Sequence, residues 1–128
     1  MENFNNVLDF ARKTIEIELD SLGKLTEFLD ENFPRAVQAI LQSKGRVVIT
    51  GIGKSAIIAQ KMVATMNSTG TPAIFMHAAD AIHGDLGMIQ PSDVVICISK
   101  SGNTPEIKVL VPLLKREGNP LIAITANR

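Results

Sequence analysis

The sequence predicts an α/β fold in which a parallel sheet lies between two layers of helices. Short apolar runs bounded by turn residues recur at 47–49, 73–77, 94–98 and 121–125, and each is typical of a buried strand. Segments with apolar residues at helical spacing separate these runs. Strands that alternate with helices form parallel sheets through right-handed crossovers, so we expect a three-layer sandwich.

Two helices are expected before the first strand. An apolar stripe with steps of three, four and seven residues predicts a long amphipathic helix over 5–30: Leu8, Ala11, Ile15, Leu22, Leu25 and Leu29. A second, shorter helix begins near Asn32, with Val37, Ile40 and Leu41 facing inward. The stripe of the first helix must be buried on its own domain or on another subunit; we favour a partial role in oligomerisation, and packing on its own domain stays open as the alternative. We expect residues 1–44 to form N-terminal helices that pack on the domain of residues 45–128.

Two further helices are expected between the strands. The one that follows the first strand extends to about Met66, with Ile58, Met62 and Met66 on one face. The one that follows the third strand has the apolar positions Ile107, Leu110, Val111 and Leu114, and Pro112 should kink it.

Composition excludes several classes of protein. The formal net charge of zero provides no basic surface for nucleic acid and no polybasic patch for a membrane. The first residues lack the pattern of a signal peptide, and no apolar run approaches the ~20 residues of a membrane span. Cys97 is the only cysteine and lies in an apolar run, which indicates a buried thiol in a reducing compartment. We therefore expect a cytoplasmic protein that binds neither nucleic acid nor a membrane.

The stretch from Ser99 to Glu106 is the strongest candidate for a binding site. It joins a buried strand to the start of a helix, where backbone N–H groups lack partners and the helix dipole favours an anion. The hydroxyl groups of Ser99, Ser101 and Thr104 and the amide of Asn103 add hydrogen-bond donors. Gly102 allows a close backbone approach. The pattern predicts a phosphate site, although the same residue types also form ordinary turns and helix caps.

A second loop of the same kind follows the first strand. Residues 51–56 (GIGKSA) fit the loose dinucleotide fingerprint, and a dinucleotide-binding module is one possible interpretation. Against it, Lys54 lies where a pyrophosphate needs bare backbone, and His77 ends the next strand where an acidic residue is expected. Two such loops at adjacent strand ends suit a small phosphorylated ligand better than a dinucleotide.

Three motifs in this order resemble the SIS (sugar isomerase) family, and more narrowly the bacterial arabinose 5-phosphate isomerases. They are GIGKS at 51–55, HGDLGM at 83–88 and the Ser-x-Ser-Gly-x-Thr-x-Glu pattern at 99–106. The resemblance implies an aldose–ketose isomerase that interconverts D-arabinose 5-phosphate and D-ribulose 5-phosphate for the sugar acid Kdo of lipopolysaccharide or capsule. It also implies a homo-oligomer, usually a tetramer, with no required cofactor.

The resemblance further implies residue roles. Lys54, His83 and Glu106 are linked to catalysis, and His77 is linked to a zinc ion that inhibits. Substrate binding is implied for a larger set that surrounds the phosphate and sugar: Ser55, Gly70, Thr71, His83, Ser99, Ser101, Gly102, Asn103 and Thr104.

Enediolate chemistry suits the catalytic set. Glu106 could act as the base, Lys54 could stabilise the developing oxyanion, and His83 could open the sugar ring or relay a proton between oxygens. Which of Glu106 and His83 takes the carbon-bound proton stays open.

Each of these residues also has a purely structural interpretation. Glu106 lies three residues after Asn103 and could complete a capping box, Lys54 could be a solvated surface charge, and His83 could be a hydrogen-bonded loop residue. His77 and His83 are too few ligands for a zinc site by themselves. A non-catalytic sugar-phosphate sensor is the main alternative function.

The family domain continues beyond four strands, through a fifth strand and helix that supply a further histidine, and CBS modules often follow. The present sequence ends at Arg128, just after the fourth predicted strand, so we expect it to hold the N-terminal part of an SIS domain.

Overall fold

The computed structural model of the chain describes residues 2–127 and contains alternating helices and strands. They divide into two compact units, one up to Arg35 and one from Ala36 onward. No helix in the described range is both long and apolar enough to cross a membrane.

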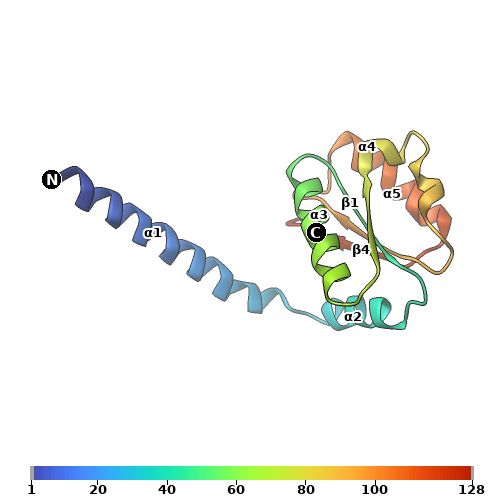
Figure 1. Cartoon of the computed structure of the whole chain (residues 1–128), viewed down its shortest axis with the longest axis horizontal. Helices are drawn as coiled ribbons and strands as arrows, with labels where there is room; N and C mark the ends of the chain where they lie inside the picture. The colour runs from blue at the N-terminus through green and yellow to red at the C-terminus, as the bar shows by residue number, and fades with distance from the viewer. Residues whose placement is uncertain (1, 128) are drawn as a thin grey trace. The chain divides into compact units, whose positions relative to one another are not determined.

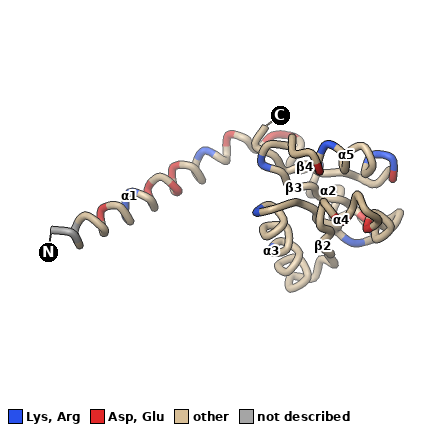
Figure 2. The backbone as a smooth tube through the Cα atoms, turned by 90° about the horizontal axis from the view of Figure 1, so that it is seen from above, with Lys and Arg blue, Asp and Glu red and all other residues tan. Residues whose placement is uncertain are grey.

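The N-terminal unit is mainly one long helix. Helix α1 covers Glu2–Lys24 and is followed by a 3-10 turn, η1, at Leu25–Phe28. The regular α-helix therefore ends at Lys24, before the end of the predicted range 5–30. Acidic and basic residues are spread along α1 (Figure 2), and two pairs of them form exposed ion pairs within the helix. The apolar stripe is exposed within this unit, for example at Ile15 and Leu22.

The second unit is built on a four-stranded parallel sheet (Figure 1). The strands are β1 (Val47–Gly51), β2 (Ala73–His77), β3 (Val94–Ile98) and β4 (Leu121–Ile124), in the order β2-β1-β3-β4. In the register, Val48 lies between Ile74 of β2 and Val95 of β3. The predicted α/β class and all four predicted strands are confirmed.

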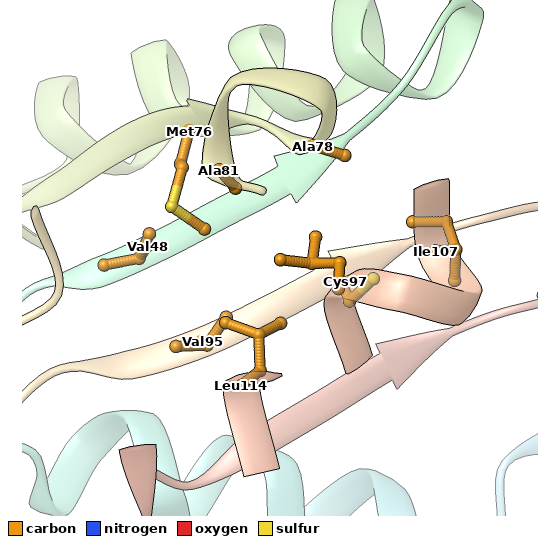
Figure 3. Close-up of a cluster of buried hydrophobic side chains, with 9 residues drawn as sticks. Val48, Met76, Ala78, Ala81, Val95, Cys97, Ile107 and Leu114 are labelled. Atoms are coloured by element: carbon orange, nitrogen blue, oxygen red, sulfur yellow. The ribbon is translucent and has the colours of Figure 1, made fainter. Parts of the chain in front are cut away.

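Helices cover both faces of this sheet. Helix α3 (Lys54–Ser68) packs on one face over a cluster formed by Val47, Ile49, Ala59, Ala73, Ile96 and Ile98. Helices α4 (Ala78–Ala81) and α5 (Pro105–Glu117) cover the other face. Their cluster, drawn in Figure 3, consists of Val48, Met76, Ala78, Ala81, Val95, Cys97, Ile107, Leu110 and Leu114. The buried thiol predicted at Cys97 is confirmed.

Two details of the predicted helix faces were wrong. Ile58 is 55% exposed, because α3 lies against the sheet through the small residues Ala56 and Ala59 instead. Helix α2 (Asn32–Gln42) leaves Val37 39% and Leu41 78% exposed, and of the three predicted inward positions only Ile40 packs against the α3-side cluster.

Candidate phosphate-binding site

The two candidate loops meet at one point of the sheet. β1 and β3 are parallel neighbours, so residues 52–53 and 99–104 leave the same, carboxyl-terminal edge of the sheet. The helices that follow them, α3 and α5, lie on opposite faces. This is the switch point at which open α/β sheets form a crevice for ligands.

The loop from Ser99 to Thr104 is held by its own hydroxyl groups. The amide of Gly102 donates to Ser99 Oγ at 3.0 Å, and the amide of Asn103 donates to Ser101 Oγ at 3.2 Å. Each hydroxyl oxygen is an acceptor in these bonds, so its own hydrogen remains available to a ligand. Gly102 has φ of +66°, a conformation that favours glycine, as the turn predicts.

Thr104 adds a third hydroxyl group to the loop. Its Oγ1 atom is buried and has no hydrogen-bond partner among the residues that the structure describes. A buried polar atom without a partner is uncommon and calls for an explanation. A bound anion that accepts from this hydroxyl would supply one.

The residues after β4 brace this loop, and the sequence motifs did not predict their part. Ser99 N donates to Ile124 O at 3.0 Å, and Ala126 N donates to Lys100 O at 3.1 Å. Asn127 Nδ2 reaches Ser101 O at 3.4 Å. These bonds continue the β3–β4 pairing past the strand ends, which only the strand order could have revealed.

Both helix starts at this edge lack a side-chain cap. Helix α3 begins after Gly53, whose φ is 59°, and α5 begins after Thr104, and neither residue makes a side-chain cap bond. Ala56 N already donates to Gly53 O at 3.1 Å, and Pro105 has no N–H group, so the amides that these helix starts can offer an anion are those of Lys54 and Ser55 in α3 and of Glu106 and Ile107 in α5. A capping box joins the N-cap residue to the third residue of the helix. Thr104 is the N-cap of α5 and Glu106 is its second residue, so the capping box considered for Asn103 and Glu106 does not form.

Gly51 permits the close approach of α3 to the end of β1. A Cβ atom at this position would lie 3.0 Å from the carbonyl carbon of Ser55 and 3.1 Å from its oxygen. These distances are too short for a side chain to fit without a backbone shift. The glycine therefore serves helix–strand packing, and Ser55 is half-buried as the second residue of α3.

The three candidate catalytic residues lie on segments at this same edge of the sheet. Lys54 is the exposed first residue of α3, and Glu106 is half-buried in the first turn of α5. His83 is exposed in the turn that follows α4, after β2, the other neighbour of β1. Segments from three adjacent strands thus carry the lysine, the imidazole and the carboxylate.

Gly70 and Thr71 lie at the opposite edge. They precede β2, and Thr71 N donates to Met66 O at 2.9 Å to close helix α3. β2 begins at Ala73 and ends at His77, and the four steps between these two residues span about 13 Å of strand. One copy of the chain therefore does not bring them to the two loops, and their part in substrate binding stays a prediction.

A groove of about 600 Å³ lies beside the candidate loop of residues 99–104, between α5 and β4. Ser99, Ser101, Gly102 and Asn103 line one part of it. Its other walls are largely apolar, from residues that include Ile107, Val111, Leu121 and Ile124. Burial raises the pKa of the Cys97 thiol, which also borders the groove.

The arrangement around His77 does not fit a metal ion. Its Nδ1 atom accepts a hydrogen bond from Ala79 N at 3.2 Å, so the lone pair of Nδ1 is occupied and the hydrogen of the neutral ring lies on Nε2. A metal-binding histidine offers one nitrogen and usually donates from the other. In addition, residues 2–127 contain no group of three or more His, Cys, Asp and Glu side chains that could hold a metal.

This sheet order, with two candidate anion-binding loops at its switch point, defines an open α/β domain with a ligand crevice at the carboxyl ends of its strands. The sequence profile of the SIS domain matches residues 40–128, and the chain belongs to the SIS domain family.

Two relatives of the chain are named as arabinose 5-phosphate isomerases. The chain is 46% identical over 123 residues to the probable arabinose 5-phosphate isomerase of Haemophilus influenzae, covering 96% of this chain and 36% of that protein. It is also 46% identical over 128 residues to arabinose 5-phosphate isomerase KdsD of Pseudomonas aeruginosa, covering 98% and 39%. The chain thus spans little more than a third of these relatives.

A solved structure of an E. coli CFT073 protein in complex with arabinose 5-phosphate has the same fold. Its TM-score is 0.87 at 40% sequence identity, and the match covers 94% of this chain and 64% of that one.

Proposed function

We propose that the protein is an aldose–ketose isomerase that interconverts D-arabinose 5-phosphate and D-ribulose 5-phosphate, supplying the Kdo of lipopolysaccharide or capsule. One observation carries the proposal. At the switch point between β1 and β3, the hydroxyl groups of Ser99 and Ser101 accept from loop amides and keep their hydrogens free, beside two helix starts without side-chain caps. The resemblance of the chain to arabinose 5-phosphate isomerases supports the choice of sugar.

In this proposal the phosphate is held at the two loops. Ser99, Ser101 and Thr104 donate their hydroxyl hydrogens, Ser55 adds another from the first turn of α3, and backbone amides complete the cradle. Gly102 and Asn103 shape the loop. The sugar then extends from the phosphate toward the residues that follow the three strand ends.

The proposed reaction moves one proton between carbon atoms. The Glu106 carboxylate takes the proton from C2 of the aldose, the electron pair of that bond forms the C1–C2 double bond, and the π pair of the C1 carbonyl moves onto O1, which gives an enediolate. The ammonium group of Lys54 stabilises the negative oxygen. His83 moves a proton between O1 and O2, and Glu106 returns its proton to C1 to give the ketose. No cofactor is required, because side chains carry out every proton transfer.

The decisive experiment compares Glu106→Gln with the parent protein. The parent should convert arabinose 5-phosphate, and the variant should lose about 10²- to 10⁴-fold in kcat while it still binds the sugar phosphate. Glu117→Gln is the matched control, because it makes the same change at the exposed end of the same helix. Unaltered turnover in Glu106→Gln would refute the role of this carboxylate. Binding without turnover in the parent would identify a sugar-phosphate sensor.

We further propose that the protein acts in the cytoplasm as a homo-oligomer, in keeping with the tetramer that the resemblance implies. The apolar side chains of α1 support an assembly, because Leu8, Ile15 and Leu22 remain more than half exposed within the N-terminal unit. A stripe of this kind on a surface helix usually packs against another element.

A further inference from the structure

His77 connects the sheet to the segment that carries His83. It is the last residue of β2 and the N-cap of α4, and its side chain accepts from Ala79 N at 3.2 Å. Its ring also meets the edge of Phe75, with the ring centroids 6.2 Å apart and the planes at 82°. A hydrogen bond and a ring contact therefore hold the half-buried imidazole.

The hydrogen bond determines which way the ring faces. Because the Ala79 amide donates to Nδ1 of His77, this nitrogen carries no hydrogen. If the ring were turned over, a C–H group would face the amide of Ala79, and that amide would lose its partner. The orientation seen here is the one that satisfies the backbone, and it leaves Nε2 as the nitrogen that carries hydrogen.

Helix α4 depends heavily on this cap. It has only four residues, Ala78–Ala81, so a single bond at its start is a large share of its hydrogen bonding. Ala78 and Ala81 anchor it, at 0% and 1% exposure, in the cluster that α5 shares. Any turn of the helix about this anchor would move the residues that follow it.

His83 follows directly from the capped turn. Its amide donates to Asp80 O at 3.0 Å, and the amide of Gly84 donates to Ala81 O at 3.4 Å. The chain of bonds therefore runs from the His77 ring to Ala79, through the short helix and on to His83. The side chain of His83 is itself exposed, so its position depends on the backbone beneath it.

We propose that His77 is a positioning residue, whose neutral imidazole caps α4 and thereby holds His83 in place at the sugar. It acts in this way instead of binding a metal ion. The inference rests on the proposed isomerase function for its effect on turnover, although the cap itself can be measured separately.

A pair of amide variants separates the two ring nitrogens. In His77→Asn, the side-chain oxygen lies near the position of Nδ1 and can accept from the amide two residues on, as asparagine caps do. In His77→Gln, the longer side chain carries its amide near the position of Nε2 and does not cap well. We expect His77→Asn to keep kcat within about threefold and His77→Gln to lower it about 10- to 100-fold, the scale on which a small misplacement of a reacting group acts. KM should change little in both.

A double-variant cycle tests whether the effect passes through His83. If it does, His77→Gln should cost nothing further in the background of His83→Ala. The proposal would be overturned if His77→Asn and His77→Gln lowered kcat equally. It would also be overturned if the effect of His77→Gln on kcat were fully additive with that of His83→Ala. Zinc binding by the parent that both amide variants abolish would also overturn it and return His77 to a metal site.

A spectroscopic measurement decides the cap independently of activity. Nitrogen NMR of the parent should show hydrogen on Nε2 of His77, and the Ala79 amide should exchange slowly in the parent and in His77→Asn but faster in His77→Gln. If the parent shows these signals but no isomerase activity, the proposed function fails and the capping role stands. If hydrogen is found on Nδ1, the inference fails whatever the activity.

Discussion

Arg46 and the buried carboxylate of Asp93 form an ion pair at the amino-terminal edge of the sheet, away from the candidate site. Arg46 Nη2 lies 2.8 Å from Asp93 Oδ2, and the Arg46 backbone amide donates to Asp93 Oδ1 at 2.7 Å. The Gln90 amide donates to Oδ2 at 2.8 Å, and the Asp93 side chain is only 1% exposed. The pair therefore joins the starts of β1 and β3, the two strands whose other ends carry the loops.

Replacing this carboxylate should destabilise the fold. We expect Asp93→Asn to lower the free energy of unfolding by about 2 kcal/mol, because the neutral amide ends the charge-assisted hydrogen bonds that Arg46 and Gln90 donate to the buried carboxylate. Denaturant unfolding would measure the change. Asp9→Asn is the control, because it makes the same substitution in an exposed pair with Arg12 and should cost about 0.5 kcal/mol or less. Similar losses in both variants would refute a special role for Asp93.

The same carboxylate makes stability depend on pH. Burial by itself would raise the pKa of Asp93, but the hydrogen bonds from Arg46 and Gln90 and the charge of Arg46 outweigh it, so the pKa is lowered. Asp93 therefore makes its full contribution to the free energy of unfolding above about pH 4, the pKa of the carboxyl group in the unfolded chain. This contribution is lost as the pH falls from there through the lower pKa of the folded protein. Unfolding measured from pH 6 down to pH 3 should show a steeper loss for the parent than for Asp93→Asn. Parallel curves would contradict this.

Ser99→Ala should weaken phosphate binding. The variant loses one donor to the ligand and leaves the Gly102 amide without its acceptor, so the dissociation constant for a sugar phosphate should rise about 10- to 100-fold. Isothermal titration would measure it. Ser68→Ala removes a hydroxyl that bonds Thr65 O near the far end of α3 and should leave the affinity unchanged. An unchanged affinity in Ser99→Ala would place the phosphate elsewhere.

Cys97 should react slowly with alkylating reagents. Burial raises the pKa of its thiol, so the reactive thiolate is scarce at neutral pH, and the side chain is 5% exposed. We expect iodoacetamide to modify the folded protein at least about tenfold more slowly than the protein unfolded in urea. Mass spectrometry over time would follow the reaction. Equal rates would show that the groove opens the thiol to solvent.

Charges on the apolar stripe of α1 should dissociate the proposed oligomer. In Ile15→Glu combined with Leu22→Glu, each copy would bring two carboxylates into an apolar interface, and light scattering should show a smaller particle than for the parent. Lys13→Glu, at an exposed charged position of the same helix, is the control and should keep the parent mass. A monomeric parent would refute the assembly.

The sequence by itself determined the fold class, the four strands and the position of the candidate binding loop. Continuous apolar runs such as Val94–Ile98 are typical of a parallel sheet whose two faces are both covered. The serines and the glycine that follow this run favour a turn by their own conformational and hydrogen-bonding preferences. These are local properties, so the order of residues is enough to reveal them. The motifs also identified Lys54, His83 and Glu106 as candidates, through the resemblance and not through periodicity.

Only the tertiary structure decided which strand ends are neighbours. The order β2-β1-β3-β4 puts the loops after β1 and β3 side by side, sends Gly70 and Thr71 to the opposite edge and braces Ser101 with Asn127. It also made His77 a cap of α4, because its partner depends on how the chain turns after β2. Strand order and helix rotation follow from packing between distant segments, and no local pattern in the sequence records the energy of such contacts.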